Sequence, residues 1–209
     1  MVIHMKKKQL EMLLQQTPAF PKPQPALEQY QTPATIASDI LFFSYQNHDI
    51  LQKNVVDLGC GTGIFSFGAA VLGAKSVLGI DIDQESIILA KEFAHIHKLN
   101  ITFLIQDISL SDFSADTVIM NPPFGAQKNN IHADQLFLRK AIKHASVIYS
   151  IHLTKTISHL EKFIEHIGGK IDDVFEVPFP LKAQFDFHKK LIETVPVSCL
   201  RIIHSSAEG

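Results

Sequence analysis

The sequence predicts an α/β protein with a doubly wound, mainly parallel sheet of seven strands, closed by an antiparallel C-terminal hairpin. Between residues 54 and 167, short β-branched runs alternate with longer runs of helical periodicity. This alternation is typical of a parallel sheet with helices on both faces. After Gly168, two long strand-like runs follow one another directly, and strands in direct succession are normally antiparallel. The 209 residues, 46% hydrophobic and 19% charged, fit one domain with one core.

Residues 1–31 are expected to form an N-terminal helix and a Pro-rich strap within a single domain, residues 1–209. Residues 6–16 place three leucines on one side of a short helix. The four prolines that follow, between residues 17 and 25, force an extended path. Thr32 followed by proline is typical of a helix N-cap, so we expect the next helix to start there and to end near residue 45. The sequence leaves open whether Met1 or Met5 is the natural start.

The rest of the chain divides into strands and helices by the period of its apolar residues. We expect strands at residues 55–58, 76–80, 101–105, 117–120, 147–151, 171–177 and 195–203. We expect helices at residues 64–72, 84–98, 133–144 and 155–167.

Composition excludes several classes of protein. The formal charge of −2 and the pI near 6.6 argue against a polycation that grips nucleic acid by bulk charge. Two cysteines are too few for a disulfide framework, and no apolar run is long enough to span a membrane. We therefore expect a cytoplasmic protein. The eleven histidines lack metal-ligand spacing, so we expect no metal site.

A glycine-rich turn follows the first strand of the predicted sheet. Asp57 begins the run Asp-Leu-Gly-Cys-Gly-Thr-Gly, in which Gly59, Gly61 and Gly63 let a nucleotide-type cofactor approach the backbone closely. The dinucleotide pattern G-x-G-x-x-G is not matched, because Ser66 stands where its last glycine would be. The turn therefore favours another cofactor, one whose positively charged end Asp57 can meet directly or through water.

Acidic residues also follow the next two strands. Asp81 is placed to accept the two hydroxyls of a ribose, although it could instead cap the following helix. Asp107 could accept from an adenine amino group, with Ile82 and Ile108 on either side of the ring. Because the carboxyl ends of parallel strands meet at one edge of a sheet, these side chains predict a binding crevice.

The stretch Asn121-Pro122-Pro123-Phe124 follows the fourth strand. Each proline restricts its own φ and that of the residue before it, so the stretch is rigid and extended. An amide, a carbonyl without a competing proline donor and an aromatic ring together suit a planar amine. The alternative is that the prolines only end the strand and open a loop.

Together these motifs resemble a class I S-adenosylmethionine-dependent methyltransferase of the amino-methylating group, which has a Rossmann-like fold. The segments 27–32, 120–125, 149–152 and 187–190 resemble more narrowly the archaeal and eukaryotic family that makes N6-methyladenosine in small-subunit ribosomal RNA. The Tyr-Pro-Thr of that family stands here as Tyr30-Gln31-Thr32, a departure that keeps Thr32.

The resemblance implies roles for particular residues. Asn121, Pro122, Pro123 and Phe124 would be catalytic, with Asn121 also touching the cofactor. Gln29 and Thr32, at the predicted helix start, would join the cofactor-binding residues, and Phe124 with His188, Lys189 and Lys190 would contact an unpaired RNA base and its phosphates.

The resemblance also implies a partner. The strand at residues Ile101–Ile105 would lie at the edge of the sheet, where a small zinc-binding activator protein could add a strand of its own. The alternatives are a protein glutamine or a DNA adenine as methyl acceptor with the same cofactor, or a non-catalytic RNA-binding subunit.

Overall fold

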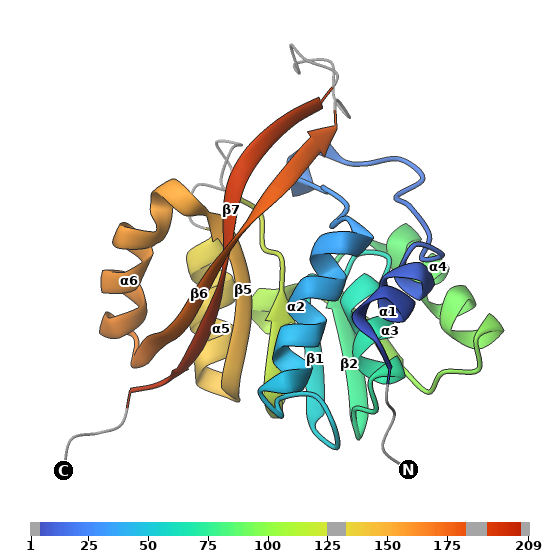
Figure 1. Ribbon diagram of the computed structural model, residues 1–209, viewed down its shortest axis with the longest axis horizontal. Coiled ribbons are helices and arrows are strands. Elements are labelled where there is room, and N and C mark those ends of the chain that lie inside the picture. Colours follow the sequence, from blue (N-terminus) through green and yellow to red (C-terminus); the bar gives the residue numbers. More distant parts are fainter. Residues whose placement is uncertain (1–4, 125–132, 183–191, 206–209) are drawn as a thin grey trace.

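The computed structural model describes residues 5–124, 133–182 and 192–205, and its centre is a seven-stranded sheet in the order β3-β2-β1-β4-β5-β7-β6 (Figure 1). The first five strands in this order are parallel, and β7 pairs antiparallel with both β5 and β6. The strands are β1 (Asn54–Leu58), β2 (Ser76–Asp81), β3 (Thr102–Ile105), β4 (Ala115–Met120), β5 (Ala145–Leu153), β6 (Gly169–Lys182) and β7 (Ile192–His204). The predicted fold class is confirmed.

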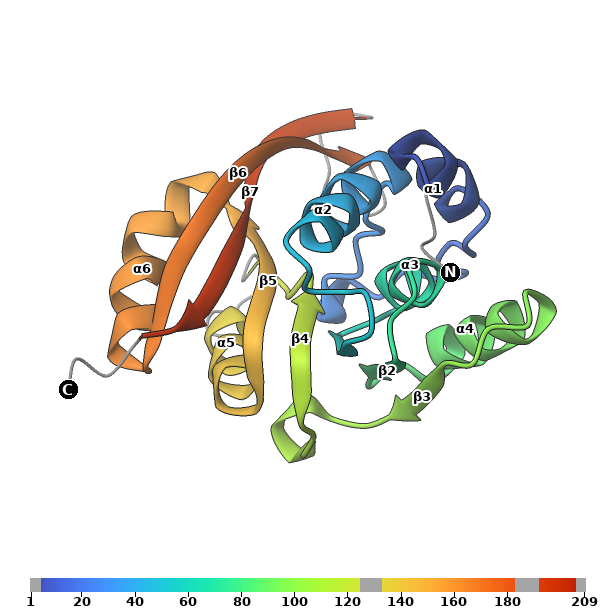
Figure 2. The ribbon, with the colours of Figure 1, turned by 60° about the horizontal axis from the view of Figure 1, so that its bottom comes forward.

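Helices cover both faces of the sheet (Figure 2). One apolar core joins the sheet to α1, α2 and α3, and a second core joins the opposite face to α5 and α6. The helices are α1 (Lys7–Leu14), α2 (Ala34–Gln46), α3 (Ile64–Val71), α4 (Gln84–Ile96), α5 (Ala133–His144) and α6 (Ile157–His166). The strand order reverses between β1 and β4, which creates a crevice at their carboxyl ends.

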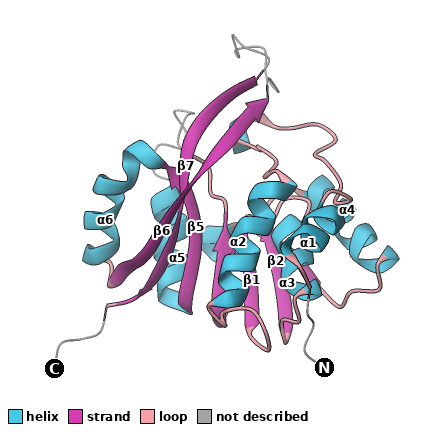
Figure 3. Cartoon of the chain, in the orientation of Figure 1, coloured by secondary structure: helices cyan, strands magenta, loops and turns pink. Residues whose placement is uncertain are grey.

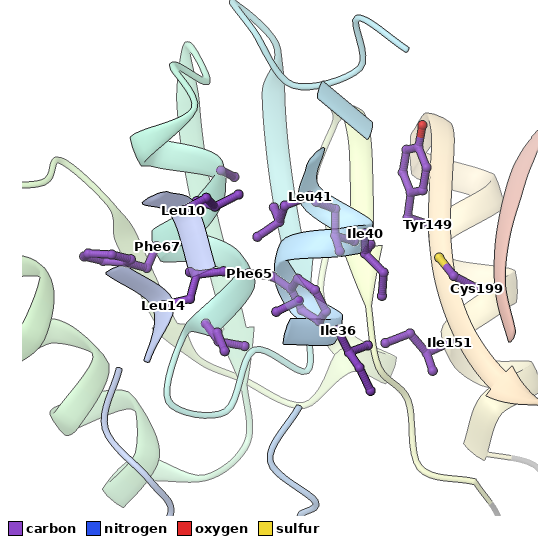
Figure 4. Packing of buried hydrophobic residues seen from close by; sticks show 14 of the residues in the cluster. Leu10, Leu14, Ile36, Ile40, Leu41, Phe65, Phe67, Tyr149, Ile151 and Cys199 are labelled. Atoms are coloured by element: carbon purple, nitrogen blue, oxygen red, sulfur yellow. The ribbon is translucent and has the colours of Figure 1, made fainter. Parts of the chain in front are cut away.

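Residues 5–33 form an N-terminal arm, made of α1 and the strap, and α1 packs into the core that also contains α2 and α3. Leu10 and Leu14 of α1 are fully buried, and Figure 4 shows them in one layer with Leu41 and Phe65. The strap then runs as a loop beyond the carboxyl ends of β1 and β2 (Figure 3). The Thr62 hydroxyl donates to the carbonyl of Pro18 at 2.6 Å, which fastens the strap to the glycine-rich turn.

The structure corrects two details of the prediction. Helix α2 begins at Ala34, after Pro33, and the Thr32 side chain does not cap it. The Thr32 hydroxyl instead accepts a hydrogen bond from Asn121, a residue 89 positions away. The C-terminal hairpin is also longer than the predicted strands at both ends.

A buried polar cluster joins the hairpin to the parallel part of the sheet. The carboxylate of Asp49 accepts from Tyr149 of β5 at 2.6 Å and from Arg201 Nε of β7 at 3.0 Å. Arg201 also pairs with Asp172 of β6. Since buried charge is stable only when it is paired and hydrogen-bonded, the cluster fixes how β6 and β7 sit against β5.

Candidate active site

The glycine-rich turn between β1 and α3 brings backbone close to the crevice. Gly59, Gly61 and Gly63 all have positive φ, at 75°, 52° and 89°. A Cβ atom on Gly61 would lie 2.7 Å from the ring of Phe20 in the strap. Only glycine therefore fits at that position without displacing the strap.

Asp57 lies beneath this turn rather than on the crevice wall. It is 1% exposed, and its Oδ2 accepts from the Ser66 backbone N–H at 2.8 Å and the Ser66 hydroxyl at 2.7 Å. Its Oδ1 has no hydrogen-bond partner among the described residues. Burial raises the pKa of the Asp57 carboxyl to about 7, a shift that the bonds from Ser66 oppose.

Asp81 ends β2 at the mouth of the crevice. Its Oδ2 accepts from the Gly61 backbone N–H at 2.7 Å and its Oδ1 from the Asp83 N–H at 2.9 Å. Burial raises the pKa of its carboxyl. Asp83 caps α4, accepting from the Glu85 N–H, and it also accepts from Gln29 Nε2 at 2.8 Å. Two backbone donors thus hold the Asp81 carboxylate at a fixed place.

The third acidic position, Asp107, follows the neighbouring strand β3. Asp107 is exposed, and its side chain accepts from the Ser109 backbone N–H at 2.8 Å. Hydrogen bonding to Ser109 holds the pKa of the Asp107 carboxyl below its usual value. Nearby Ile108 is buried, but Ile82 is 52% exposed, which leaves an apolar surface ready for a flat ring.

These elements enclose a pocket of about 280 Å³, which we call the cofactor pocket. Of the predicted residues, its walls include Gln29, Thr32, Gly59, Gly61, Asp81, Ile82, Asp107, Ile108, Asn121 and Pro123. Asp57, Gly63, Pro122 and Phe124 are not among the lining residues, and His188, Lys189 and Lys190 lie outside the described residues.

Sequence reasoning missed several walls of this pocket. They are Phe20 and residues 27–28 from the arm, and Leu136 and Phe137 from α5. The proline-rich strap could have indicated Phe20, because an apolar side chain on a rigid extended segment is expected to pack against the domain. The pattern of the α5 residues predicted only the apolar side of a helix, so nothing in it indicated a pocket.

Asn121 lies where the cofactor pocket meets the carboxyl end of β4. Its Nδ2 donates to the Thr32 hydroxyl at 3.0 Å, which fixes the orientation of the amide. Its Oδ1 is buried and has no hydrogen-bond partner within the described part of the chain. A buried acceptor without a partner is costly, so it indicates a site for a donor from a ligand.

The aromatic residue of the same stretch is also held in place. Phe124 is half-buried, and the edge of its ring meets Phe179 of β6, with ring centroids 6.2 Å apart and planes at 86°. Phe179 is fully buried, so its ring gives Phe124 a fixed neighbour.

Residues 5–124, 133–182 and 192–205 contain no cluster of three His, Cys, Asp or Glu side chains that could hold a metal ion. Within the same ranges, no helix has the length and apolar character needed to cross a bilayer.

Comparison with known proteins identifies the family. The family model of the methyltransferase small domain matches residues 34–147. The rRNA N(6)-adenosine-methyltransferase METTL5 of Danio rerio is 40% identical, covering 94% of this chain and 98% of its own length. Its Drosophila melanogaster counterpart is 33% identical, covering 94% and 96%. The crystal structure of PH1948 from Pyrococcus horikoshii is 37% identical, with a TM-score of 0.90 over 98% of this chain and 100% of that one. The chain therefore belongs to the methyltransferase small domain family, and it is an S-adenosylmethionine-dependent methyltransferase as its sequence predicts.

Proposed function

We propose that this enzyme methylates the N6 amine of an adenine in RNA, and that the RNA belongs to the small ribosomal subunit. The observation that carries the proposal is the buried Oδ1 of Asn121, which has no hydrogen-bond partner among the described residues. The relatives from Danio rerio and Drosophila melanogaster, named rRNA N(6)-adenosine-methyltransferases, support the choice of acceptor.

The residues of the cofactor pocket fit S-adenosylmethionine. Asp81, held by two backbone N–H groups, keeps lone pairs that can accept ribose hydroxyls. Ile82 and Ile108 offer apolar surface for the adenine ring, and Asp107 an acceptor for its amino group. When bound, the cofactor supplies a methyl group carried on a positively charged sulfur.

The acceptor residues would activate a weak nucleophile. The exocyclic amine of adenine reacts poorly because its lone pair is delocalised into the ring. Asn121 Oδ1 and the carbonyl of Pro122 would accept its two hydrogens, drawing the nitrogen toward tetrahedral geometry and directing its lone pair at the methyl group. A carbon–nitrogen bond forms, the carbon–sulfur bond breaks and the surplus proton on nitrogen passes to solvent. Since no strong base is required, positioning supplies much of the rate, of the order of several kcal/mol.

Phe124 would stack on the target base. Aromatic side chains bind unpaired bases in this way, whereas bases inside a duplex are inaccessible. The edge contact with Phe179 supports the role, because a ring held in one orientation loses less freedom when a base stacks on it. We assign contacts with the neighbouring phosphates to His188, Lys189 and Lys190.

Substitution of Asn121 tests the acceptor site. Purified Asn121→Ala protein is expected still to bind S-adenosylmethionine in calorimetry but to lose methyl transfer to ribosomal RNA, measured with a radiolabelled methyl group. Asn47→Ala is the matched control, because Asn47 is exposed and its side chain bonds only to the carbonyl of Phe43 among the described residues. Full activity of Asn121→Ala would refute the assignment.

The same assay identifies the substrate. Small-subunit RNA is expected to carry the label at N6 of adenine after digestion to nucleosides. Label on large-subunit RNA alone, on DNA or on protein glutamine would replace the proposed acceptor, and no label on any of them would refute the proposal of an RNA adenine.

We also propose that a small zinc-binding activator protein adds a strand to β3. Strand β3 lies at the edge of the sheet, and Leu104 and Ile105 are 42% and 49% exposed. The opposite edge, β6, instead exposes the charged side chains of Asp172, Asp173 and Glu176. Natural proteins use such charge to prevent strand pairing, so the bare apolar edge at β3 is the one suited to a partner.

Leu104→Lys tests this interface, whereas Phe103 is unsuitable because its side chain is 5% exposed and packs into the core. The variant is expected to keep its melting temperature and to lose co-purification with an activator of this kind. Val174→Lys, on the exposed part of β6, is the matched control. Equal binding by both variants would refute the proposed interface.

A further inference from the structure

A second cavity, of about 440 Å³, adjoins the cofactor pocket. It lies between the end of α1, the strap, the start of α2 and the ring of Phe179 from β6. Its volume falls within the range of ordinary ligand sites. The cofactor chemistry described above uses none of the residues that line this cavity alone.

The second cavity borders the acceptor site on two sides. Tyr30, Gln31 and Thr32 line both the second cavity and the cofactor pocket. Thr32 accepts the hydrogen bond that orients Asn121. Phe179, on the wall of the second cavity, touches the ring of Phe124. A group held in the cavity would therefore be a close neighbour of the base that is methylated.

The chemistry of the lining excludes a charged ligand. No described residue of its wall is Asp, Glu, Lys, Arg or His. Burial raises the pKa of the Tyr30 hydroxyl, so that group stays neutral as well. Neither a phosphate nor the charged amino-acid end of the cofactor would find an opposite charge here.

What the lining does offer is one accessible aromatic ring and several neutral polar groups. Tyr30 supplies the half-buried ring, fully buried Phe179 closes the wall, and the exposed side chains of Gln15 and Thr35 can both donate and accept hydrogen bonds. Gln31 donates through Nε2 to the carbonyl of Pro18 at 3.2 Å, so its Oε1 remains as an acceptor. Aromatic faces combined with amides at the edge are how proteins hold single unpaired nucleobases.

We infer that the second cavity holds the base of a nucleotide next to the target adenine in the same RNA strand. This inference rests on the proposed function. It makes the enzyme read the immediate sequence around its target, through a site made by the arm and by β6.

The experiment pairs changes in the RNA with changes in the protein. The wild-type enzyme first marks its adenine in ribosomal RNA, and short single-stranded RNAs centred on that adenine are then made with one neighbouring nucleotide abasic at a time. An abasic nucleotide keeps the sugar and phosphate but removes the base. Because stacking of one base is worth about 1–3 kcal/mol, one abasic position is expected to lower kcat/KM by about tenfold.

Two variants then locate the effect in the cavity. Gln15→Ala is expected to lower kcat/KM severalfold for the intact RNA but not for the sensitive abasic RNA. Ala19→Trp, which fills the cavity from an exposed position that the cofactor pocket does not share, should make the two RNAs equivalent. Gln16→Ala is the matched control, since Gln16 is also exposed and lines neither pocket.

The outcomes separate the two proposals. Wild-type enzyme that methylates no RNA overturns the proposed function. Wild-type enzyme that methylates every abasic RNA as well as the intact one overturns the inference alone. Equal behaviour of Gln15→Ala and Gln16→Ala, or an abasic penalty that persists in a folded Ala19→Trp protein, also overturns it.

Discussion

Thr32→Val tests whether the orientation of the Asn121 amide, the proposed acceptor site, matters for methyl transfer. The Thr32 side chain is 5% exposed, and its hydroxyl accepts from Asn121 Nδ2 at 3.0 Å. Valine keeps the shape of threonine and removes the acceptor, so the amide loses the contact that turns its Oδ1 toward the substrate. A buried donor left without a partner costs about 1–3 kcal/mol. If that cost appears in the transition state, kcat should fall by roughly 5- to 150-fold.

The assay measures kcat for methyl transfer and the dissociation constant of S-adenosylmethionine separately. Thr32→Ser, which retains the hydroxyl, should recover most of the activity lost in Thr32→Val, while both variants bind the cofactor with wild-type affinity. A dissociation constant that weakens by as much as kcat falls would mean that Thr32 acts by touching the cofactor. Unchanged kcat in Thr32→Val would refute the argument that this bond positions Asn121.

Three further predictions concern the turn and the interior. The pKa of Asp57, about 7 in the folded state, lies above its unfolded value of 3.8, so stability should fall by about 1.4 kcal/mol per pH unit as pH rises from 4 to 7. Asp57→Asn, which can still accept from the Ser66 N–H, should remove this slope in urea titrations. The pKa of His152 is instead lowered by burial to about 3, so stability should fall at a similar rate as pH drops below 6.5. His152→Gln should reduce that loss of stability in acid. Gly61→Ala should weaken cofactor binding about tenfold, measured by calorimetry, because its Cβ would displace the ring of Phe20.

The sequence predicted that Asp81 and Asp107 meet at one edge of the sheet because both residues follow strands. Asp81 and Asp107 stand directly after β2 and β3, so identifying the strands as parallel was enough to bring them to one edge of the sheet. Asp57 shows the limit of that reasoning. Its position in the chain matches the others, but the last residues of β1 are buried on both faces, and its carboxylate bonds to α3 below the turn.

Contacts between residues far apart in the sequence produce no local sequence pattern, so they could not be predicted. Thr32 before proline looks like a helix cap, and only the folded chain brings its hydroxyl to Asn121, 89 residues later. The apolar run of β3 gives no indication that Phe103 faces inward while Leu104 and Ile105 are exposed. A cavity is harder still to predict from the sequence, because it depends on the space that the arm, α2 and β6 leave between them.

The family model matches a central segment of the chain, and the residues before and after that segment contribute different parts of the site. The family model of the methyltransferase small domain begins at residue 34 and ends at residue 147, and it contains the glycine-rich turn, the three acidic positions and Asn121. The arm before it and the hairpin after it supply Thr32, Tyr30 and Phe179, the groups that surround the acceptor. The rRNA N(6)-adenosine-methyltransferases, in contrast, align with 94% of the chain, arm and hairpin included. The shared segment thus carries the glycine-rich turn and Asn121, and we propose that the arm and the hairpin adapt this common core to an RNA adenine.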